Sequence, residues 1–399
     1  MDFGTRLGDD FVQDPHRIGR LLREEGPVRQ VTLRRGLPAW LVTSYAEARS
    51  LLADPRLAKD ASKRPQLFPR AATGDEPSPF SRMIAAHLLN SDPPDHTRLR
   101  RLVAKAFTGR TVARLRPRIE QIADELLDDL AGSAEVDLVE SYAFPLPITV
   151  ICELLGVPSE DRDRFRAWSA TLISPADADE LGRASHELAA YLITLLDRKR
   201  EAPADDLLSD LVHTSDEGDQ LSQAELVSMA FLLLVAGHET TVSLIANGVL
   251  ALLREPDQLA ALRADPSLLP GAVEEFLRFD GPINLATLRY TTEPVRVGDV
   301  ELPENAFVLV SLLAANRDEA RFPDPDRLDI TRSANGHLAF GHGIHYCVGA
   351  PLARLEGEIA IGRLLHRFGD LRLAGAEDGL RWRDSTLVHA LESLRVRLS

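Results

Sequence analysis

The sequence predicts a mostly α-helical protein that folds as one domain over residues 1–399 and carries only small β-sheets. Apolar residues recur at helical spacing through most of 98–253, with breaks at prolines. One helical pattern, 221–254, would span roughly 45–50 Å at 1.5 Å per residue, enough to cross a whole domain. Strand-like runs are short and lie in two regions, 28–43 and 285–310. No repeat or linker divides the chain, so one domain is the simplest interpretation.

The N-terminal part of the chain alternates between short elements and loops. Residues 1–26 predict an irregular lead and a short helix, and 28–33 with 40–43 predict a β-hairpin. A helix over 45–53 ends before an Asp-Pro pair. Residues 59–89 predict a loop, and a loop of this length in a compact domain is expected to have a function.

Helices dominate after this loop. Ser222 and Glu225 form the pattern of a capping box at the start of the longest one. A second hairpin is expected over 295–302, around Gly-Asp. A last helix follows Ala350-Pro351, because proline suits a first helical turn and the apolar residues after it recur at helical spacing.

Composition is ordinary for a soluble globular protein, with 44% hydrophobic and 27% charged residues. The net charge of -15 argues against nucleic-acid binding. Cys152 lies in an apolar helical run, so we expect its side chain to pack in the core. Two cysteines cannot form a disulfide scaffold, which favours a reducing, cytoplasmic setting. Met1-Asp2-Phe3-Gly4 opens no signal peptide, and the longest apolar run, 229–236, is too short to span a bilayer, so no membrane association is expected.

A glycine-rich loop, Phe340-Gly-His-Gly-Ile-His-Tyr-Cys-Val-Gly349, leads directly into the last helix. A helix N-terminus favours thiolate over thiol, and the glycines permit tight turns and close approach to a flat ligand. Three interpretations remain. The cysteine could simply be buried in a turn, or it could bind zinc or copper with nearby histidines, or it could be the single axial thiolate of haem iron. The metal interpretation would use His337, His342, His345 and Cys347.

The middle of the longest helix reads Ala236-Gly-His-Glu-Thr-Thr241. Glycine weakens a helix, and polar groups in an apolar helix need partners. Without any function, Thr240 would bond back to a carbonyl one turn earlier and Glu239 would reach solvent. With a function, Thr240 and Glu239 would instead be a positioned hydrogen-bond donor and a carrier of protons.

The loop pattern Phe-x-x-Gly-x-x-x-Cys-x-Gly and the helix pattern Ala-Gly-x-Glu-Thr-Thr are both complete, and together they resemble the cytochrome P450 family of haem-thiolate monooxygenases. The resemblance implies the P450 fold, with the long helix over the haem. It also implies haem b (iron protoporphyrin IX) as cofactor, Cys347 as the iron ligand and O2 as co-substrate. Thr240 and Glu239 would be the catalytic residues. The haem-contacting residues would include Ala236, Gly237, Phe340 and Gly341.

A basic helix is expected after Asp92-Pro-Pro-Asp95. Residues 96–118 contain eight lysines or arginines and no acid. His96 and Arg100 lie one turn apart, so both side chains can face one anion. The family resemblance assigns them, together with Arg289 and His345, to the haem propionates.

A glutamate–arginine pair on one helix face, Glu275 and Arg278, would decorate many exposed helices. Here the resemblance implies that the pair joins Arg327 in a buried charge triad with a structural role. The aromatic residue usual after that arginine is Leu328 in this chain, a mild departure.

The motifs look most like the soluble bacterial branch of the family, which often oxidises macrolides and other secondary metabolites. We therefore expect hydroxylation or epoxidation of a bulky apolar molecule, of macrolide or polyketide type, by a monomer. No flavin or nicotinamide fingerprint is present, so electrons from NAD(P)H would arrive through ferredoxin reductase and ferredoxin. The expected ferredoxin contacts are Arg101, Lys105, Arg110 and Arg354.

Three other classes of protein fit the sequence less well. A non-enzymatic haem-thiolate sensor would keep Cys347 but would not need Glu239 and Thr240. A zinc hydrolase would leave the acid–threonine helix and the basic helix unexplained. A peroxide-driven variant would tolerate loss of the Glu-Thr pair, which this chain retains.

Overall fold

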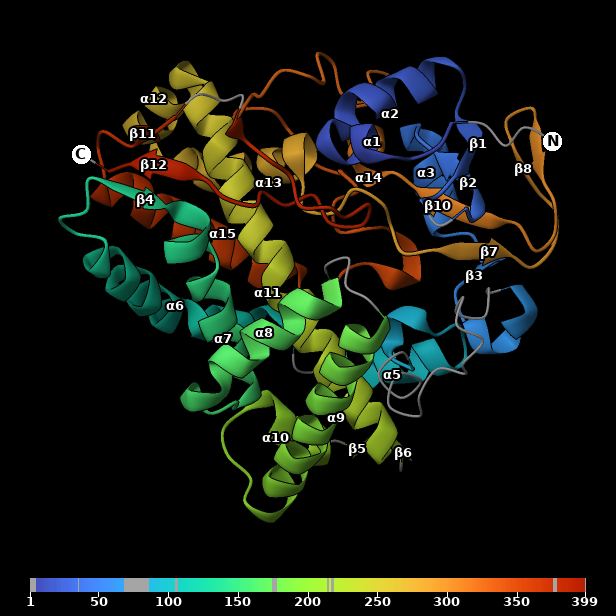
Figure 1. Cartoon of the computed structure of the whole chain (residues 1–399), viewed down its shortest axis with the longest axis horizontal. Coiled ribbons are helices and arrows are strands. Elements are labelled where there is room, and N and C mark those ends of the chain that lie inside the picture. The colour runs from blue at the N-terminus through green and yellow to red at the C-terminus, as the bar shows by residue number, and fades with distance from the viewer. Residues whose placement is uncertain are drawn as a thin grey trace. The chain divides into compact units, whose positions relative to one another are not determined.

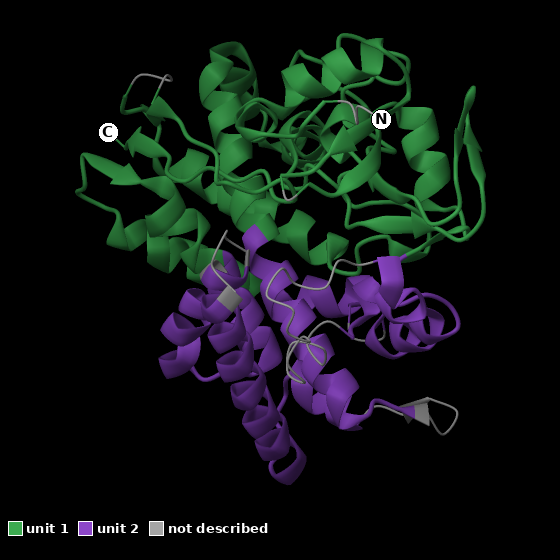
Figure 2. Cartoon of the chain, turned by 45° about the vertical axis from the view of Figure 1, so that its right-hand side comes forward, with its two compact units in different colours: residues 1–58, 116–146, 240–399 green, residues 59–115, 147–239 purple. Residues whose placement is uncertain are grey.

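A computed structural model describes most of the chain, in the ranges 5–34, 36–67, 86–104, 107–173, 178–213, 215–216, 219–375 and 379–398. Contacts divide the chain into two compact units, coloured separately in Figure 2. Unit 1 comprises Met1–Ala58, Arg116–Leu146 and Thr240–Ser399, and unit 2 comprises Lys59–Leu115 and Pro147–Glu239. The boundary between Glu239 and Thr240 falls inside helix α11 (Gln223–Arg254).

Unit 1 combines helices with small sheets (Figure 1). The predicted early helices are confirmed. Its helices are α1 (Asp9–Gln13), α2 (Pro15–Glu24), α3 (Tyr45–Leu52), α12 (Pro256–Ala264), α13 (Leu269–Asp280), α14 (Leu312–Asn316) and α15 (Ala350–Arg367). It also has a π-helix, η4 (Val139–Ala143), and two short 3-10 helices, η6 (Pro266–Leu268) and η7 (Gly343–His345).

The main sheet of unit 1 has five strands in the order β1-β2-β10-β7-β3. The predicted first hairpin is confirmed, since β1 (Val28–Thr32) pairs antiparallel with β2 (Pro38–Val42). The second is confirmed as β8 (Val295–Val297) with β9 (Val300–Leu302). The remaining strands of unit 1 are β3 (Leu57–Ala58), β4 (Glu135–Asp137), β7 (Arg289–Thr291), β10 (Phe307–Val310), β11 (Arg372–Leu373) and β12 (Arg395–Arg397).

A hydrophobic cluster joins this sheet to the helices beside it. β-branched residues such as Val42 and Val310 pack with Leu51 of α3 and Leu312 of α14. Each fully buried aliphatic side chain contributes roughly 1.5–3 kcal/mol relative to an exposed one. Leu338 belongs to the same cluster, so the segment that leads into the cysteine loop is anchored to the sheet.

Unit 2 is mostly helical, with one small hairpin of β5 (Ser215–Asp216) and β6 (Asp219–Gln220). The loop predicted over 59–89 begins with two short turns, η1 (Ala61–Lys63) and η2 (Pro65–Leu67). Its residues 68–85 lie outside the described residues. Unit 2 further contains the helices and turns α5 (Asp95–Ala104), α8 (Arg162–Ile173), α9 (Ala178–Glu201), α10 (Leu207–His213), η3 (Leu88–Asn90) and η5 (Ser159–Asp161). The unit boundary also crosses α6 (Gly109–Asp129) and α7 (Pro145–Leu155).

Helix α11 is the long helix that the sequence predicts, with 32 residues. Its capping box is confirmed. The Ser222 backbone N–H donates to the Glu225 carboxylate at 2.8 Å, and the Glu225 N–H donates to the Ser222 hydroxyl at 3.3 Å. Among the described residues α11 is the one helix long and apolar enough to cross a membrane, but 67% of its apolar window is buried, as in the core helix of a globular protein.

The predicted charge triad exists with a different third member. Glu275 and Arg278 of α13 are fully buried and form two hydrogen bonds, at 2.7 and 2.8 Å. The third partner is Arg332, whose Nε donates to Glu275 at 3.2 Å. The prediction of Arg327 is wrong. Because neighbouring Leu328 takes the buried position, the Arg327 side chain faces solvent, and only its carbonyl accepts a hydrogen bond from Arg278.

Candidate active site

The cysteine loop is closed by its own backbone. The Cys347 N–H donates to the Phe340 carbonyl at 2.9 Å, and the Gly341 N–H donates to the Leu338 carbonyl at 2.8 Å. Gly343 has φ +74°, and a Cβ there would lie 2.9 Å from both the Ala53 Cα and the Leu52 carbonyl oxygen. Only glycine therefore fits at residue 343, and the loop is locked against the end of α3.

The two cysteines differ in accessibility. Cys347 is exposed three residues before α15 begins at Ala350, whereas Cys152 is buried in α7. Burial raises the pKa of the Cys152 thiol to about 12, so it stays protonated and packs, as predicted. A Cβ at Gly349 would come within 3.9 Å of the Cys347 sulfur, so the glycine leaves that flank of the sulfur open.

A charged network that the motifs do not reveal supports this loop from α13 and α15. Glu274 accepts hydrogen bonds from Arg354 at 2.5 and 3.0 Å and pairs with His337 at 3.1 Å. Burial raises the pKa of Glu274, but the hydrogen bonds from His337 and Arg354 outweigh it and hold that pKa at about 2. The Arg354 guanidinium also lies 4.5 Å from the centre of the Phe340 ring. The acid–arginine pair thus positions the first residue of the loop.

The zinc or copper interpretation of the loop is not supported. Within the described residues, His337, His342, His345 and Cys347 do not bring three ligand atoms together. His337 is buried and already contacts Glu274. A single accessible sulfur remains, which suits an iron whose other ligands come from a cofactor.

Residues 236–239 of the Ala-Gly-His-Glu-Thr-Thr motif lie in the part of α11 that belongs to unit 2, and they differ in their exposure to solvent. Ala236 is exposed although it lies in an apolar run, and Gly237 packs so closely on α7 that a Cβ would lie 3.1 Å from Ile151. Glu239 is only 3% exposed, so the interpretation that sends it to solvent is wrong. The helix therefore combines a small-residue surface with a buried acid.

Two polar residues that sequence reasoning missed surround this acid. Ser169 of α8 lies 3.1 Å from His238 Nε2 and 3.4 Å from the Glu239 carboxylate. His238 Nδ1 lies 2.7 Å from the Leu234 carbonyl, which can only accept, so Nδ1 carries a proton. The other ring nitrogen, Nε2, faces both the Ser169 hydroxyl and the Glu239 carboxylate, the latter at 3.3 Å. In the sequence, a histidine inside an apolar helix was the one sign that Glu239 has buried polar neighbours.

In unit 1, the next turn of α11 contacts a second buried acid. Thr240 is half-buried, and Thr241 hydrogen-bonds through its side chain to Glu356 of α15. Burial raises the pKa of Glu356 well above its usual value, against the smaller effect of the Thr241 hydrogen bond. Glu356 stands among buried Leu352, Leu355 and Ile359, and an acid at that position was the signal that sequence reasoning passed over.

Replacing Glu356 by glutamine is expected to stabilise the protein increasingly as pH rises. A carboxyl whose pKa is raised on folding stays protonated in the folded state while the unfolded chain ionises. Wild-type stability therefore falls above the unfolded pKa of about 4.3, by at most about 1.4 kcal/mol per pH unit. Urea unfolding between pH 5 and 8 should show the variant's advantage widening. Glu358→Gln, at a half-buried acid on the same helix, is the control and should show no such divergence.

The predicted propionate-binding residues lie in both units. In unit 2, His96 is buried in α5, Arg100 is half-buried, and burial together with the Arg100 charge lowers the pKa of His96. In unit 1, Arg289 is buried in β7, with one guanidinium nitrogen 3.3 Å from the Thr287 carbonyl. His345 is half-buried in η7. Each unit therefore offers one histidine and one arginine suited to carboxylates.

Haem fits what unit 1 offers. The accessible donor is one thiolate-forming sulfur at a helix start, on a loop whose glycines admit close approach. Soft thiolate is an established axial ligand for haem iron. Buried Arg289 is a cation of the kind that a haem carboxylate edge requires.

Comparisons with known proteins agree with this chemistry. A family model described as cytochrome P450 matches residues 180–372. Cytochrome P450 107B1 of Saccharopolyspora erythraea is 56% identical over 390 residues, covering 98% of this chain and 96% of that protein. The cytochrome P450 monooxygenase PikC of Streptomyces venezuelae is 50% identical, covering 100% of this chain and 94% of that protein.

The solved structure of the tirandamycin C-bound P450 monooxygenase TamI has a TM-score of 0.90 and 50% identity, covering 99% of this chain and 100% of that one. The mostly α fold with small sheets is therefore the P450 fold, and the cofactor of the family is haem. With an exposed cysteine in a complete loop motif and full-length identity above one half, the chain belongs to the cytochrome P450 family and is a haem-dependent monooxygenase.

Proposed function

We propose that this monooxygenase hydroxylates or epoxidises a bulky, weakly polar molecule of the macrolide or polyketide class. The supporting observation is full-length similarity to enzymes named for such substrates. 6-Deoxyerythronolide B hydroxylase of Saccharopolyspora erythraea is 47% identical, and mycinamicin IV hydroxylase/epoxidase of Micromonospora griseorubida is 45% identical. A sterol-like substrate is the second candidate, because the vitamin D(3) 25-hydroxylase of Pseudonocardia autotrophica is 52% identical.

A ligand library tests this proposal. Purified haem-loaded protein is titrated with macrolactones, linear polyketides, sterols and fatty acids, and binding is read from the shift of the haem absorption band. Product formation with a surrogate ferredoxin system is then followed by mass spectrometry. Micromolar binding and mono-oxygenated product with macrolactones would support the proposal. Turnover confined to sterols or fatty acids would refute it.

Each site residue has a proposed task. The Cys347 thiolate would hold the haem iron, and haem, when bound, would supply the O2 activation by which one oxygen atom enters the substrate. Thr240 donates a hydrogen bond where oxygen is activated, and Glu239 passes protons, held in place by Ser169 and His238. The propionate partners are His96, Arg100, Arg289 and His345, and the haem walls include Ala236, Gly237, Phe340 and Gly341.

Both units would serve one function. We propose a single domain over 1–399, because α11 is continuous from unit 2 into unit 1. We also propose a monomer in the cytoplasm, where an exposed thiol such as Cys347 stays reduced.

Thr240→Ala is expected to uncouple the enzyme. Substrate binding should change little, because alanine keeps the shape of the helix and only the small threonine side chain is shortened. NAD(P)H consumption should continue, but the fraction recovered as product should fall roughly 10-fold or more, with hydrogen peroxide replacing it. Peroxide and product are measured per NAD(P)H consumed. Thr240→Ser restores a hydroxyl and should recover coupling. Unchanged coupling in Thr240→Ala would remove the proposed role.

Electrons are proposed to come from NAD(P)H through ferredoxin reductase and ferredoxin. Ferredoxins are typically acidic, and opposite local potentials raise encounter rates. Arg101 of α5 and Arg110 of α6 are exposed, as docking requires. Lys105 lies outside the described residues. Arg354 is held by Glu274, so replacing it would disturb the cysteine loop as well as any docking surface.

Charge reversal at Arg101 and Arg110 therefore gives the cleaner docking test. The double variant should be reduced by ferredoxin roughly 10-fold more slowly at low salt, and the deficit should shrink as ionic strength rises. Stopped-flow absorbance gives the rate, and ligand-induced spectral shifts should be unaffected. Arg296→Glu, an exposed arginine on the β8–β9 hairpin, is the matched control. The one basic helix predicted over 96–118 is divided between α5, which ends at Ala104, and α6, which begins at Gly109. Equal slowing by the control would contradict specific docking at Arg101 and Arg110.

A further inference from the structure

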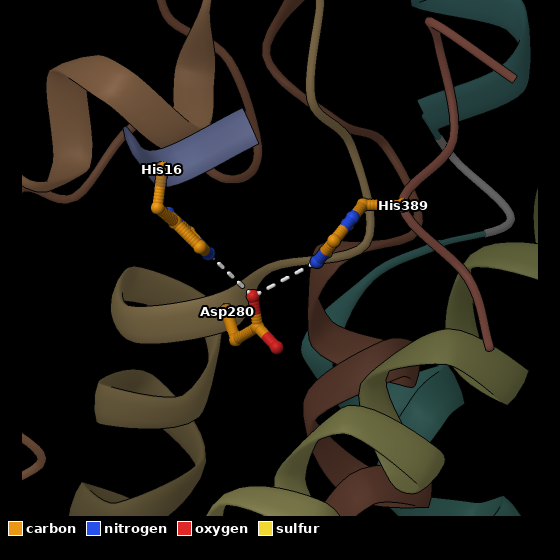
Figure 3. A group of neighbouring side chains, drawn as sticks. All are labelled: His16, Asp280 and His389. Carbon is orange, nitrogen blue, oxygen red and sulfur yellow. Dashed lines mark hydrogen bonds and ion pairs between the residues drawn. The ribbon is translucent and has the colours of Figure 1, made fainter. Parts of the chain in front are cut away.

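Three ligand-type side chains from distant parts of the sequence converge within unit 1 (Figure 3). His16 lies in the first turn of α2, Asp280 is the last residue of α13, and His389 lies in the C-terminal segment. Both Nε2 atoms face the same Asp280 oxygen, at 2.7 Å for His16 and 3.0 Å for His389. All three ligand atoms lie within 4.8 Å of one another.

Surrounding groups hold His389 and Asp280 in place. The His389 ring stacks on Trp382, with centroids 3.6 Å apart, and its backbone N–H donates to the Pro282 carbonyl at 2.8 Å. Asn247 of α11 donates to the backbone carbonyls of both His389 and Asp280, each at 3.1 Å. Two of the three ligands are therefore positioned before anything binds, which reduces the entropic cost of binding.

Charged groups around the three side chains are mixed in sign. Asp280 supplies the carboxylate oxygen that faces both imidazoles. Arg317 is the cation that faces the group, and Asp326 pairs with its guanidinium at 2.9 Å, which offsets its repulsion.

We propose that His16, Asp280 and His389 form a binding site for a divalent metal ion of the zinc class. Two imidazoles and a carboxylate are ligands that Zn²⁺ accepts, with water as the fourth. Bonds of about 2.0–2.1 Å in a tetrahedron place ligand atoms about 3.3 Å apart. The separations from the Asp280 oxygen, 2.7 Å to His16 and 3.0 Å to His389, must open by about 0.6 and 0.3 Å to reach this spacing. The two Nε2 atoms, which lie within 4.8 Å of each other, must also settle at about 3.3 Å. The His16 side chain is 20% exposed, which gives an ion access from solvent.

This site is separate in chemistry from the cysteine loop. It contains no sulfur, and its ligands join the N-terminal helix α2, the end of α13 and the C-terminal segment. A bound ion would cross-link these three segments and stabilise the folded state by mass action. The site is therefore proposed as structural.

Metal analysis of the haem-loaded, tag-free protein tests the proposal. The protein is stripped with EDTA and dialysed against Zn²⁺, and zinc and iron are counted by mass spectrometry. About one zinc ion per chain is expected, with a higher unfolding temperature in its presence. Asp280→Asn and His389→Gln should weaken zinc affinity at least about 100-fold. His366→Gln, at an exposed histidine of α15, is the control and should bind zinc as the wild type does.

X-ray absorption at the zinc edge of the wild type provides a test that does not depend on the variants folding. Two imidazole nitrogens and oxygen at about 2.0–2.1 Å are expected. A sulfur neighbour at about 2.3 Å would place the ion at a cysteine and overturn the proposal. Substoichiometric zinc in the wild type, or zinc retained by both Asp280→Asn and His389→Gln, would also overturn it.

Discussion

Cys347→Ala is expected to abolish monooxygenation and the absorption signature of haem-thiolate. The Cys347 sulfur is the exposed thiol of the described chain, and the loop leaves its flank open at Gly349. Alanine offers no lone pair, so bound haem would lose its axial ligand and the electron density that thiolate supplies. The strongly red-shifted Soret band of the reduced, carbon monoxide-treated protein should disappear, and product should fall below detection.

Cys152→Ala is the matched control for this variant. Its sulfur is buried in α7 and stays protonated, so its removal should leave a small packing defect while the thiolate signature persists. Circular dichroism of both variants separates loss of ligand from loss of fold. A normal thiolate band in Cys347→Ala, or its loss in Cys152→Ala, would show that Cys347 is not the iron ligand.

Arg278→Leu is expected to cause a severe loss of folding stability. The substitution leaves Glu275 as a fully buried charge that has lost its bidentate partner. Breaking a buried pair from one side costs about 3–5 kcal/mol, against a total folding stability of about 5–15 kcal/mol. Urea unfolding should show a large drop in midpoint, with poor retention of haem.

Two further arginines test the composition of this cluster. Arg332→Ala removes a hydrogen bond to Glu275 and should lower the unfolding midpoint measurably. Arg327→Ala removes an exposed side chain and should leave the midpoint unchanged, because its carbonyl contact to Arg278 survives. If Arg327→Ala were the more damaging substitution, the assignment of Arg332 would be wrong.

Local signals made much of the fold predictable from the sequence. The capping box of Ser222 and Glu225 depends on residues three positions apart, and the two hairpins depend on short turns between β-branched runs. The glycines and cysteine of the loop likewise lie within ten residues of one another. Where the chemistry is contained in one stretch of chain, the sequence was sufficient.

Contacts between distant stretches were not predictable in the same way. Arg332 and Arg327 lie in an irregular segment without a side-chain period, so nothing local distinguishes the inward arginine from the outward one. The Glu274–Arg354 pair joins two helices 80 positions apart. The convergence of His16, Asp280 and His389 requires three segments to be folded first. These features depend on tertiary packing, which a single sequence does not display.

The close fit of Gly343 against the end of α3 has a consequence for engineering. Because the loop backbone abuts the Leu52 carbonyl and the Ala53 Cα and Cβ, a larger side chain at residue 53 would push on the segment that carries the sulfur. Mutations in an N-terminal helix would then alter chemistry almost three hundred residues further along the chain. Mutant libraries built to change substrate preference should therefore leave this helix end untouched, although no catalytic side chain lies there.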